Sequence, residues 1–220
     1  MHWQKVGFGR LDQCPFRWNI ARDVTDKKFI GMITITPYKP VWPEEFAEIG
    51  KILRRNLGDL ALRIDHIGST AVPGLAAKDR IDVQITVESL ASPVEEALQR
   101  CGYERMRHIA QDHIPPGGDS DAAQWTKWIF SPSNPAHAVN VHARLPGRAN
   151  QRYALLFRDY LRAHPAIAAA YAQVKQELVA HQLNNSEAYY AVKDPVCDII
   201  IGGAEAWAAS TEWKLGPSDC

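Results

Sequence analysis

The segment from His66 to Asp82 combines residue types that can bind phosphate and a metal ion. A predicted strand runs into Gly68-Ser69-Thr70, and a second strand begins near Asp82. Glycine lets the backbone approach a ligand closely, and Ser69 with the free N–H groups of a short helix can hold phosphate oxygens. Asp82 supplies a hard oxygen ligand suited to Mg²⁺. A metal ion there would neutralise charge during nucleotidyl transfer.

Two histidines give a second interpretation of the same region. His66, Asp82 and His142 lie on neighbouring predicted strands, and two imidazoles with one carboxylate can bind a transition metal. His142 is also a candidate general base. The alternative is that both histidines form hydrogen bonds inside the sheet or contact a ligand directly.

Cationic side chains outside this turn are further candidates for phosphate binding. Arg158 can bind a phosphate with two donors, whereas Lys193 would act as a point charge. Lys78 borders the loop before the carboxylate and can contact a phosphate or remain on the surface. In the competing interpretation, Arg158 and Lys193 each pair with the aspartate that follows in the sequence. For Lys175, a solvated helix face is the favoured interpretation.

The composition narrows the class of protein. Of the 220 residues, 46% are hydrophobic and 23% are charged, as in ordinary globular domains. Lys+Arg and Asp+Glu are equal at 25 each, so no basic surplus predicts a nucleic-acid partner. The four cysteines form no CxxC pair, and the chain has no apolar leader and no apolar run of about 18 residues. These features favour a reduced, cytoplasmic chain without a membrane span.

The elements that must position these residues follow from the hydrophobic pattern. Alternating or β-branched runs predict strands over 33–36, 62–67, 81–87, 103–109, 125–130 and 138–145. Helical spacing predicts helices over 43–57 and 94–101, and the pattern is helical from about residue 150 onward. Proline at position 195 is expected to interrupt the last helical stretch. The sequence therefore predicts an α+β fold, with a mixed β-sheet core, flanking helices and a C-terminal helical segment.

The same pattern divides the chain into four parts. Residues 1–30 form an N-terminal extension, whose aromatic side chains up to Trp18 can pack on the body of the protein. Residues 31–148 form the core, 149–209 the C-terminal helical segment, and 210–220 a tail.

Several motifs together resemble the GrpB family, a branch of the nucleotidyltransferase-fold superfamily. They are His66 to Asp82, Pro37-Tyr38-Lys39-Pro40 with Trp42, Asn140-Val141-His142, Phe157-Arg158-Asp159-Tyr160-Leu161-Arg162, Tyr171 with Lys175, and Tyr189 with Lys193. The resemblance covers roughly residues 33–208. It implies a nucleotidyltransferase-like core, and family members are sometimes fused to dephospho-CoA kinase.

The chain departs from the superfamily pattern at the metal ligands. That pattern has two carboxylates alternating on one strand and a third on a later strand, so that they face the same way and share two metals. Here Gln84 takes the second position, and the later strand carries Asn140 and His142. An amide is a weak metal ligand. These residues therefore favour one Mg²⁺ at Asp82, with nucleotide phosphates as its remaining ligands, over a two-metal site.

Three functions are compatible with these residues. The first is a nucleotidyltransferase-like enzyme that binds a nucleoside triphosphate through Gly68 and Ser69, with a divalent metal at Asp82, and transfers a nucleotidyl group to a small molecule or protein. The second is a non-catalytic accessory module that binds a nucleotide or a coenzyme A precursor. The third is a metal-dependent enzyme that uses His66, Asp82 and His142.

Overall fold

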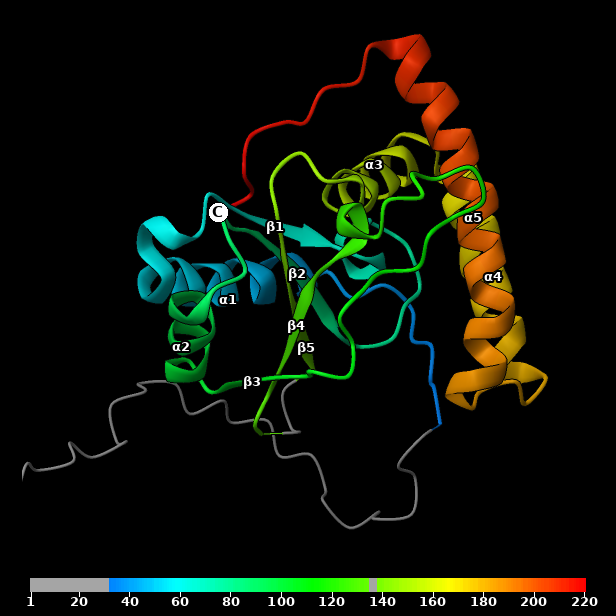
Figure 1. Ribbon diagram of the computed structural model, residues 1–220. Helices are drawn as coiled ribbons and strands as arrows, with labels where there is room; N and C mark the ends of the chain where they lie inside the picture. The colour runs from blue at the N-terminus through cyan, green and yellow to red at the C-terminus, as the bar shows by residue number, and fades with distance from the viewer. Residues whose placement is uncertain (1–31, 135–137) are drawn as a thin grey trace, which may run out of the picture. The chain divides into compact units, whose positions relative to one another are not determined.

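A mixed β-sheet forms the centre of the computed structural model, which describes residues 32–134 and 138–220 (Figure 1). The predicted extension over 1–30 lies outside these residues. The sheet of the described part has five strands in the order β1-β2-β5-β4-β3. They are β1 (Arg63–Ile67), β2 (Ile81–Thr86), β3 (Tyr103–Arg105), β4 (Trp128–Pro132) and β5 (Val139–Arg144). The central pair, β2 and β5, is parallel, and the other pairs are antiparallel.

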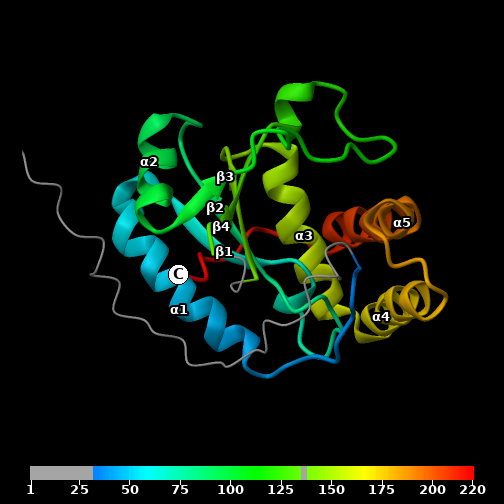
Figure 2. The same ribbon diagram turned by 90° about the horizontal axis from the view of Figure 1, so that it is seen from below.

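One face of the sheet is covered by α1 (Trp42–Leu57) and α2 (Ser92–Arg100) (Figure 2). The α1 helix has proline in its first turn and two glutamates close behind, which suits the positive end of the helix dipole. Alternate residues of the central strands are buried against these helices. The resulting core includes Phe46, Leu53, Val83, Ile85, Leu98, Val141 and Ala143.

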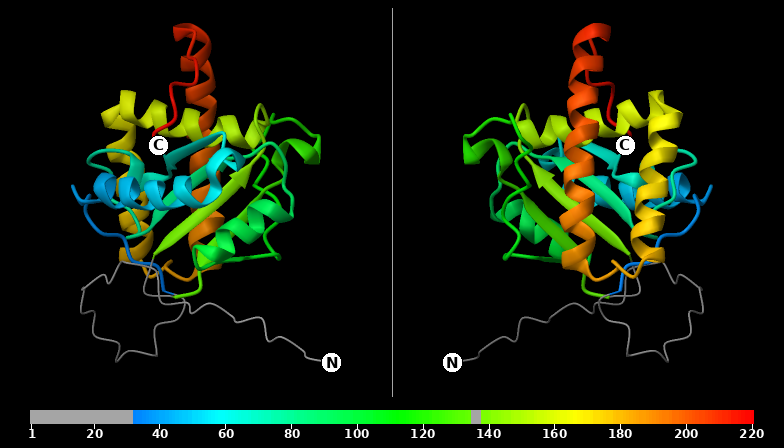
Figure 3. Two further views of the ribbon diagram at one scale, coloured as in Figure 1. Left: turned by 90° about the vertical axis from the view of Figure 1, so that its left-hand side faces the viewer. Right: turned by 90° about the vertical axis from the view of Figure 1, so that its right-hand side faces the viewer.

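The helical segment predicted after residue 150 lies on the opposite side of the sheet. It consists of α3 (Ala149–Ala163), α4 (Pro165–Ala180) and α5 (Ser186–Thr211), and Figure 3 shows α4 and α5 standing beside each other with α3 running across them. A second apolar cluster joins the three helices to the loop after β1. Its members include Val72, Leu75, Leu156, Leu161, Tyr171, Ile200 and Ile201. The other face of the sheet, which carries polar side chains, therefore lies opposite these three helices.

Three predicted strands are shorter than expected or are absent. The strand over 33–36 is wrong, because Thr36 forms only an isolated bridge with Ala77 and Met32 another with Asn185. Pro37 follows directly and has no N–H to continue the pairing. The strand over 103–109 ends at Arg105, and the strand over 125–130 begins only after a 3-10 turn.

The expected break at Pro195 is also wrong, because α5 runs through it. A proline inside a helix costs roughly 3 kcal/mol. Both halves of α5 nevertheless bury side chains, with Tyr189 before the proline and Cys197 and Ile200 after it. This packing outweighs the local cost. Although α5 has 26 residues, neither it nor another helix in the described part is long and apolar enough to cross a membrane.

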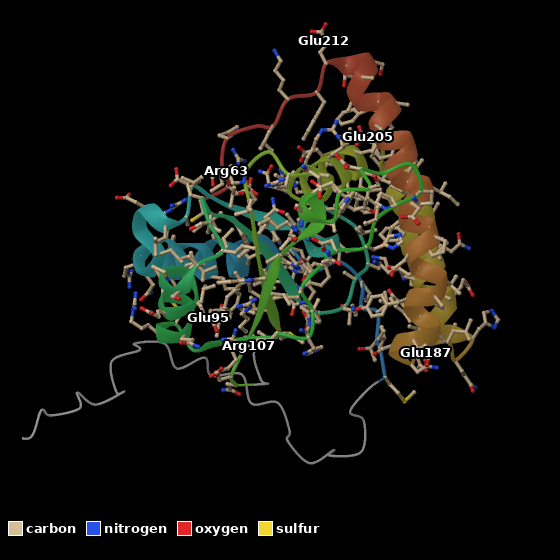
Figure 4. All side chains as sticks on the ribbon, in the orientation of Figure 1. Arg63, Glu95, Arg107, Glu187, Glu205 and Glu212 are labelled. Carbon is tan, nitrogen blue, oxygen red and sulfur yellow. The ribbon has the colours of Figure 1, made fainter. Side chains whose placement is uncertain are left out.

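After α5 the chain returns to the outer edge of β1 (Figure 1). The Cys220 N–H donates to the Ile64 carbonyl at 3.1 Å, and the Ser218 hydroxyl accepts from the Ile64 N–H at 2.9 Å. Arg63 donates to the Gly216 carbonyl at 2.8 Å and lies beside this C-terminal segment in Figure 4. The end of the chain is therefore fixed to the edge of the sheet.

Candidate functional site

A cavity of about 430 Å³ lies between the polar face of the sheet and the helices α3, α4 and α5. This volume is within the usual range for small-molecule sites. Among the described residues that line it, cationic side chains outnumber carboxylates. They are Lys78, Arg80, Lys127, Arg144, Lys175 and Lys193, against Asp82, Asp112 and Asp194. The cavity therefore favours an anionic ligand.

The parallel pairing of β2 and β5 places four polar side chains on the cavity face. Asp82 is opposite Asn140, and Gln84 is opposite His142. The Asn140 amide donates to the Asp82 carboxylate at 2.9 Å, and His142 Nε2 lies 3.6 Å from the same oxygen. Burial alone would raise the pKa of Asp82, but the contacts with His142 and Asn140 lower it below its usual value. The site thus holds an ionised carboxylate.

The turn before this carboxylate depends on glycine. Gly68 has a φ of +73°, and a Cβ there would lie 2.7 Å from Asp82 Oδ2. Only glycine permits both the backbone conformation and the approach of the carboxylate. Ser69 and Thr70 follow in a short 3-10 turn and line the cavity with Gly68. The Thr70 hydroxyl donates to the Arg80 carbonyl at 3.2 Å.

The expected solvent exposure of Lys175 is wrong. Its side chain is buried, with 2% of the residue exposed, and its ammonium donates to the Ser69 hydroxyl at 3.0 Å and to the Ala76 carbonyl. Burial, together with the charges of Lys193 and Lys78, lowers the pKa of Lys175 to about 7. The α4 helix is rich in alanine, so its sequence showed no clear contrast between a buried and a solvated face.

Lys78 and Lys193 meet at the same end of the cavity as Lys175. The Lys78 ammonium lies 2.6 Å from the Tyr190 hydroxyl and 4.9 Å from the centre of that ring. The Lys193 ammonium lies 5.6 Å from the centre of the Tyr190 ring and forms the expected ion pair with Asp194 at 3.1 Å. We call Lys78, Lys175 and Lys193 the lysine cluster.

A second group of charges surrounds Asp112. Arg144 binds its two carboxylate oxygens, each at 2.9 Å, Lys127 binds at 2.6 Å, and the Asn150 amide donates at 3.0 Å. Burial would raise the pKa of Asp112, but Arg144 and Lys127 hold it well below its usual range. Arg144 also donates to the Gln84 side-chain oxygen at 2.6 Å. The amide in the second carboxylate position is therefore already bound to a guanidinium.

The expected metal site of His66, Asp82 and His142 is not assembled. His66 is opposite Val83 and stacks on Phe46 of α1, with ring centres 4.6 Å apart, on the other face of the sheet. Burial lowers the pKa of His66 to about 4. Within residues 32–134 and 138–220, no three His, Cys, Asp or Glu side chains are grouped to hold a metal ion.

Aromatic side chains form one wall of the cavity between the Asp112 group and the lysine cluster. Ring centres are 6.3 Å apart for Trp125 and Tyr153, 6.0 Å for Tyr153 and Phe157, and 5.8 Å for Phe157 and Tyr171. The Lys175 ammonium lies 4.5 Å from the centre of the Tyr171 ring. We call Trp125, Tyr153, Phe157 and Tyr171 the aromatic wall.

Comparison with known proteins identifies the family. The family model described as GrpB protein matches residues 32–202. The chain belongs to the GrpB family. The crystal structure of the conserved protein GrpB from Enterococcus faecalis superposes with a TM-score of 0.64 and 30% identity, covering 79% of this chain and 99% of that one. The predicted α+β, nucleotidyltransferase-like fold is confirmed for this GrpB protein.

Two curated relatives are similar in sequence to this GrpB protein. A dephospho-CoA kinase of Mycolicibacterium paratuberculosis is 41% identical over 214 residues, a match that covers 91% of this chain and 52% of that protein. A UPF0157 protein of Halalkalibacterium halodurans is 31% identical, covering 79% of this chain and 83% of that protein. The chain thus spans about half the length of the kinase relative.

Arg158 of this GrpB protein lies outside the cavity lining, although it was a candidate phosphate ligand. It forms the expected ion pair with Asp159 at 2.8 Å and a second with Asp219 at 2.7 Å. It also donates to the His66 carbonyl at 3.0 Å. Arg158 therefore connects α3, β1 and the C-terminal segment.

The cavity lining also includes Asp112, Arg144 and Asn150, which were not predicted as site residues from the sequence. Arg144 follows Asn140 and His142 in steps of two on β5, so alternation alone places it on the same face. Asp112 lies in an irregular loop, and Asn150 lies in the first turn of α3. No local pattern distinguishes either of these two from a surface residue.

Proposed function

We propose that this GrpB protein binds a nucleotide in the cavity, with the phosphates at the lysine cluster. The observation that carries the proposal is that Lys78, Lys175 and Lys193 all line one cavity with an aromatic wall. Lys175 contacts the Ser69 hydroxyl, and the Lys78 and Lys193 ammonium groups both lie beside the Tyr190 ring. Phosphate oxygens would accept hydrogen bonds from the ammonium groups and offset their mutual repulsion.

The relatives named dephospho-CoA kinase support a nucleotide-related role. Because this chain spans only about half of their length, the proposed function is nucleotide binding and does not include their kinase activity.

The donor set does not fit a two-metal site. Asp82 supplies a single carboxylate. The side-chain oxygen of Gln84 accepts a hydrogen bond from Arg144, and the side-chain NH2 of Asn140 donates to Asp82. The side-chain oxygen of Asn140 accepts from Arg80 at 2.8 Å. In the proposed site, fixed cationic side chains therefore provide the positive charge that a second metal ion would supply.

Nucleotidyl transfer is the second candidate function, and the ionised Asp82 beside His142 favours it. Asp82 and phosphate oxygens of the ligand would hold one Mg²⁺, which would neutralise charge on the phosphates. The Nδ1 atom of His142 is buried without a hydrogen-bond partner among the described residues. We propose that it would accept the proton of the attacking hydroxyl as an acceptor–phosphate bond forms and pyrophosphate leaves.

Thermal stability of the purified protein tests both functions. ATP, GTP, CTP, UTP, dephospho-CoA and tripolyphosphate are added separately, with and without Mg²⁺. A ligand that binds the folded state raises the melting temperature. We expect a shift that Lys175→Met removes, whereas Lys51→Met, at an exposed surface ion pair, retains it.

The metal arm of this experiment separates the two candidates. A shift that needs Mg²⁺ and is lost in Asp82→Ala supports the transfer site, whereas a shift independent of Mg²⁺ supports cation-based binding alone. If none of the six ligands changes the melting temperature, the proposed function is wrong.

A further inference from the structure

Asn150 leaves one polar atom without a partner at the end of the cavity opposite the lysine cluster. The residue is 1% exposed and lines the cavity. Its side-chain N–H groups donate to Asp112 and to the Thr126 carbonyl, both at 3.0 Å. The side-chain oxygen has no hydrogen-bond partner in the part of the chain that the structure describes. Because both N–H groups are engaged, the orientation of the amide is fixed and the free atom is an acceptor.

A buried acceptor without a partner loses about 1–3 kcal/mol of hydrogen-bonding free energy. A bound ligand with an N–H group would recover this loss. Asn150 is therefore placed to recognise a donor on a ligand rather than to stabilise the empty cavity. The Asp112 group holds it rigidly, because Asp112 is itself fixed by Arg144 and Lys127.

The surroundings of Asn150 indicate what kind of group carries the donor. Tyr153 and Phe157 follow it on α3 at spacings of three and seven residues, so all three share one helix face. Both aromatic residues line the cavity, and Trp125 precedes Thr126, whose carbonyl binds Asn150. A flat heteroaromatic ring with a donor at its edge matches an apolar aromatic wall beside one acceptor.

We propose that Asn150 selects a nucleobase that carries an exocyclic amino group, with the base against the aromatic wall and the phosphates at the lysine cluster. This inference rests on the proposed nucleotide binding and specifies its substrate class. The amino group would donate to the Asn150 side-chain oxygen. A carbonyl at the same place would put two acceptors against each other and weaken binding.

The test measures dissociation constants by calorimetry for matched pairs of nucleotides. ATP is compared with purine riboside triphosphate, which lacks only the 6-amino group, GTP with ITP, which lacks the 2-amino group, and CTP with UTP. We expect the amino-bearing member of at least one pair to bind about fivefold more tightly or better. In Asn150→Ala the ratio for that pair should fall to about one.

Two controls separate the failure of this inference from other failures. Asn56→Ala removes an exposed asparagine amide on α1 and should keep the wild-type ratio. Circular dichroism and the melting temperature establish that Asn150→Ala is folded. If nucleotides bind but no pair shows a preference, or if the preference persists in folded Asn150→Ala, the inference is wrong while nucleotide binding stands. If neither nucleotides nor tripolyphosphate bind, the proposed function itself fails.

Discussion

The ammonium group of Lys175 on α4 lies 3.0 Å from the hydroxyl oxygen of Ser69, 106 positions earlier in the chain. This contact joins the C-terminal helices to the turn that precedes Asp82. It also removes the ammonium group from water, because the residue is almost fully buried. The cavity and the altered pKa of Lys175 therefore both depend on docking of the helices against the sheet.

Lys175 should make the stability of the protein depend on pH. Its pKa is about 7 in the folded state, whereas an unfolded lysine titrates near about 10.4. Between these values the unfolded state binds more protons, so the free energy of unfolding should rise as the pH increases from about 7 to about 10. Urea unfolding at pH 6.5, 8 and 9.5 measures this slope. Lys175→Met should reduce it, and Lys51→Met should not. An equal slope in wild type and Lys175→Met would contradict the burial of a titrating ammonium.

Gly68→Ala should displace Asp82. The new Cβ would lie 2.7 Å from the carboxylate oxygen, and the positive φ strains any side chain by roughly 1–2 kcal/mol. We expect nucleotide affinity to fall at least about tenfold, measured by calorimetry. Gly102→Ala is the matched control, because its φ is +80° with no atom within 4 Å of an added Cβ. It should lose similar stability but keep its affinity, and an equal loss of affinity in both variants would show that backbone strain alone is responsible.

Asp112→Asn should strongly destabilise the protein. Removing the carboxylate leaves Arg144 and Lys127 as buried cations without their anion, a loss of about 3–5 kcal/mol. Because the pKa of Asp112 is depressed, its contribution is present above the unfolded value near about 3.9 and is lost as the pH falls below it. Chemical unfolding at pH 7 and pH 3 measures both effects. Glu48→Gln breaks an exposed ion pair and should cost far less stability. A comparable cost in the two variants would rule out a buried charge cluster.

Gln84→Glu should not restore a two-metal site. The Gln84 oxygen lies 2.6 Å from Arg144, so a carboxylate there would form an ion pair with the guanidinium. We expect the Mg²⁺ dependence of nucleotide binding to stay as in wild type, measured from melting temperatures over a range of Mg²⁺ concentrations. A clear gain in Mg²⁺ affinity would contradict this prediction and show that a metal ion displaces the Arg144 guanidinium.

The sequence predicted the sheet and its helices well where periodicity was strong. The strands around Asp82 and His142 and the helix after Trp42 lie where alternation and helical spacing placed them. Pro195 misled the prediction, because burial of side chains on both sides outweighed a local backbone cost. Local patterns report local preferences, and tertiary packing can reverse them.

The candidate site was predicted less completely than the fold. The Gly68-Ser69 turn and Asp82 come from one continuous motif, and the structure places all three at the cavity. His66 lies on the other face of the sheet from Asp82. The residue type alone does not show which face of a strand a side chain occupies, because this depends on the register of the strand. Asp112 and Asn150 could not be found, because their roles depend on partners distant in the sequence.

The C-terminal segment that lies along β1 also affects how molecules of this protein behave toward one another. An uncovered edge strand offers unpaired N–H and C=O groups to a strand from another molecule. In the described part of the sheet, β3 is an edge of three residues, and the β1 edge is bonded to Ser218 and Cys220. Neither edge gives a second sheet a long template, which protects the protein against edge-to-edge aggregation at high concentration.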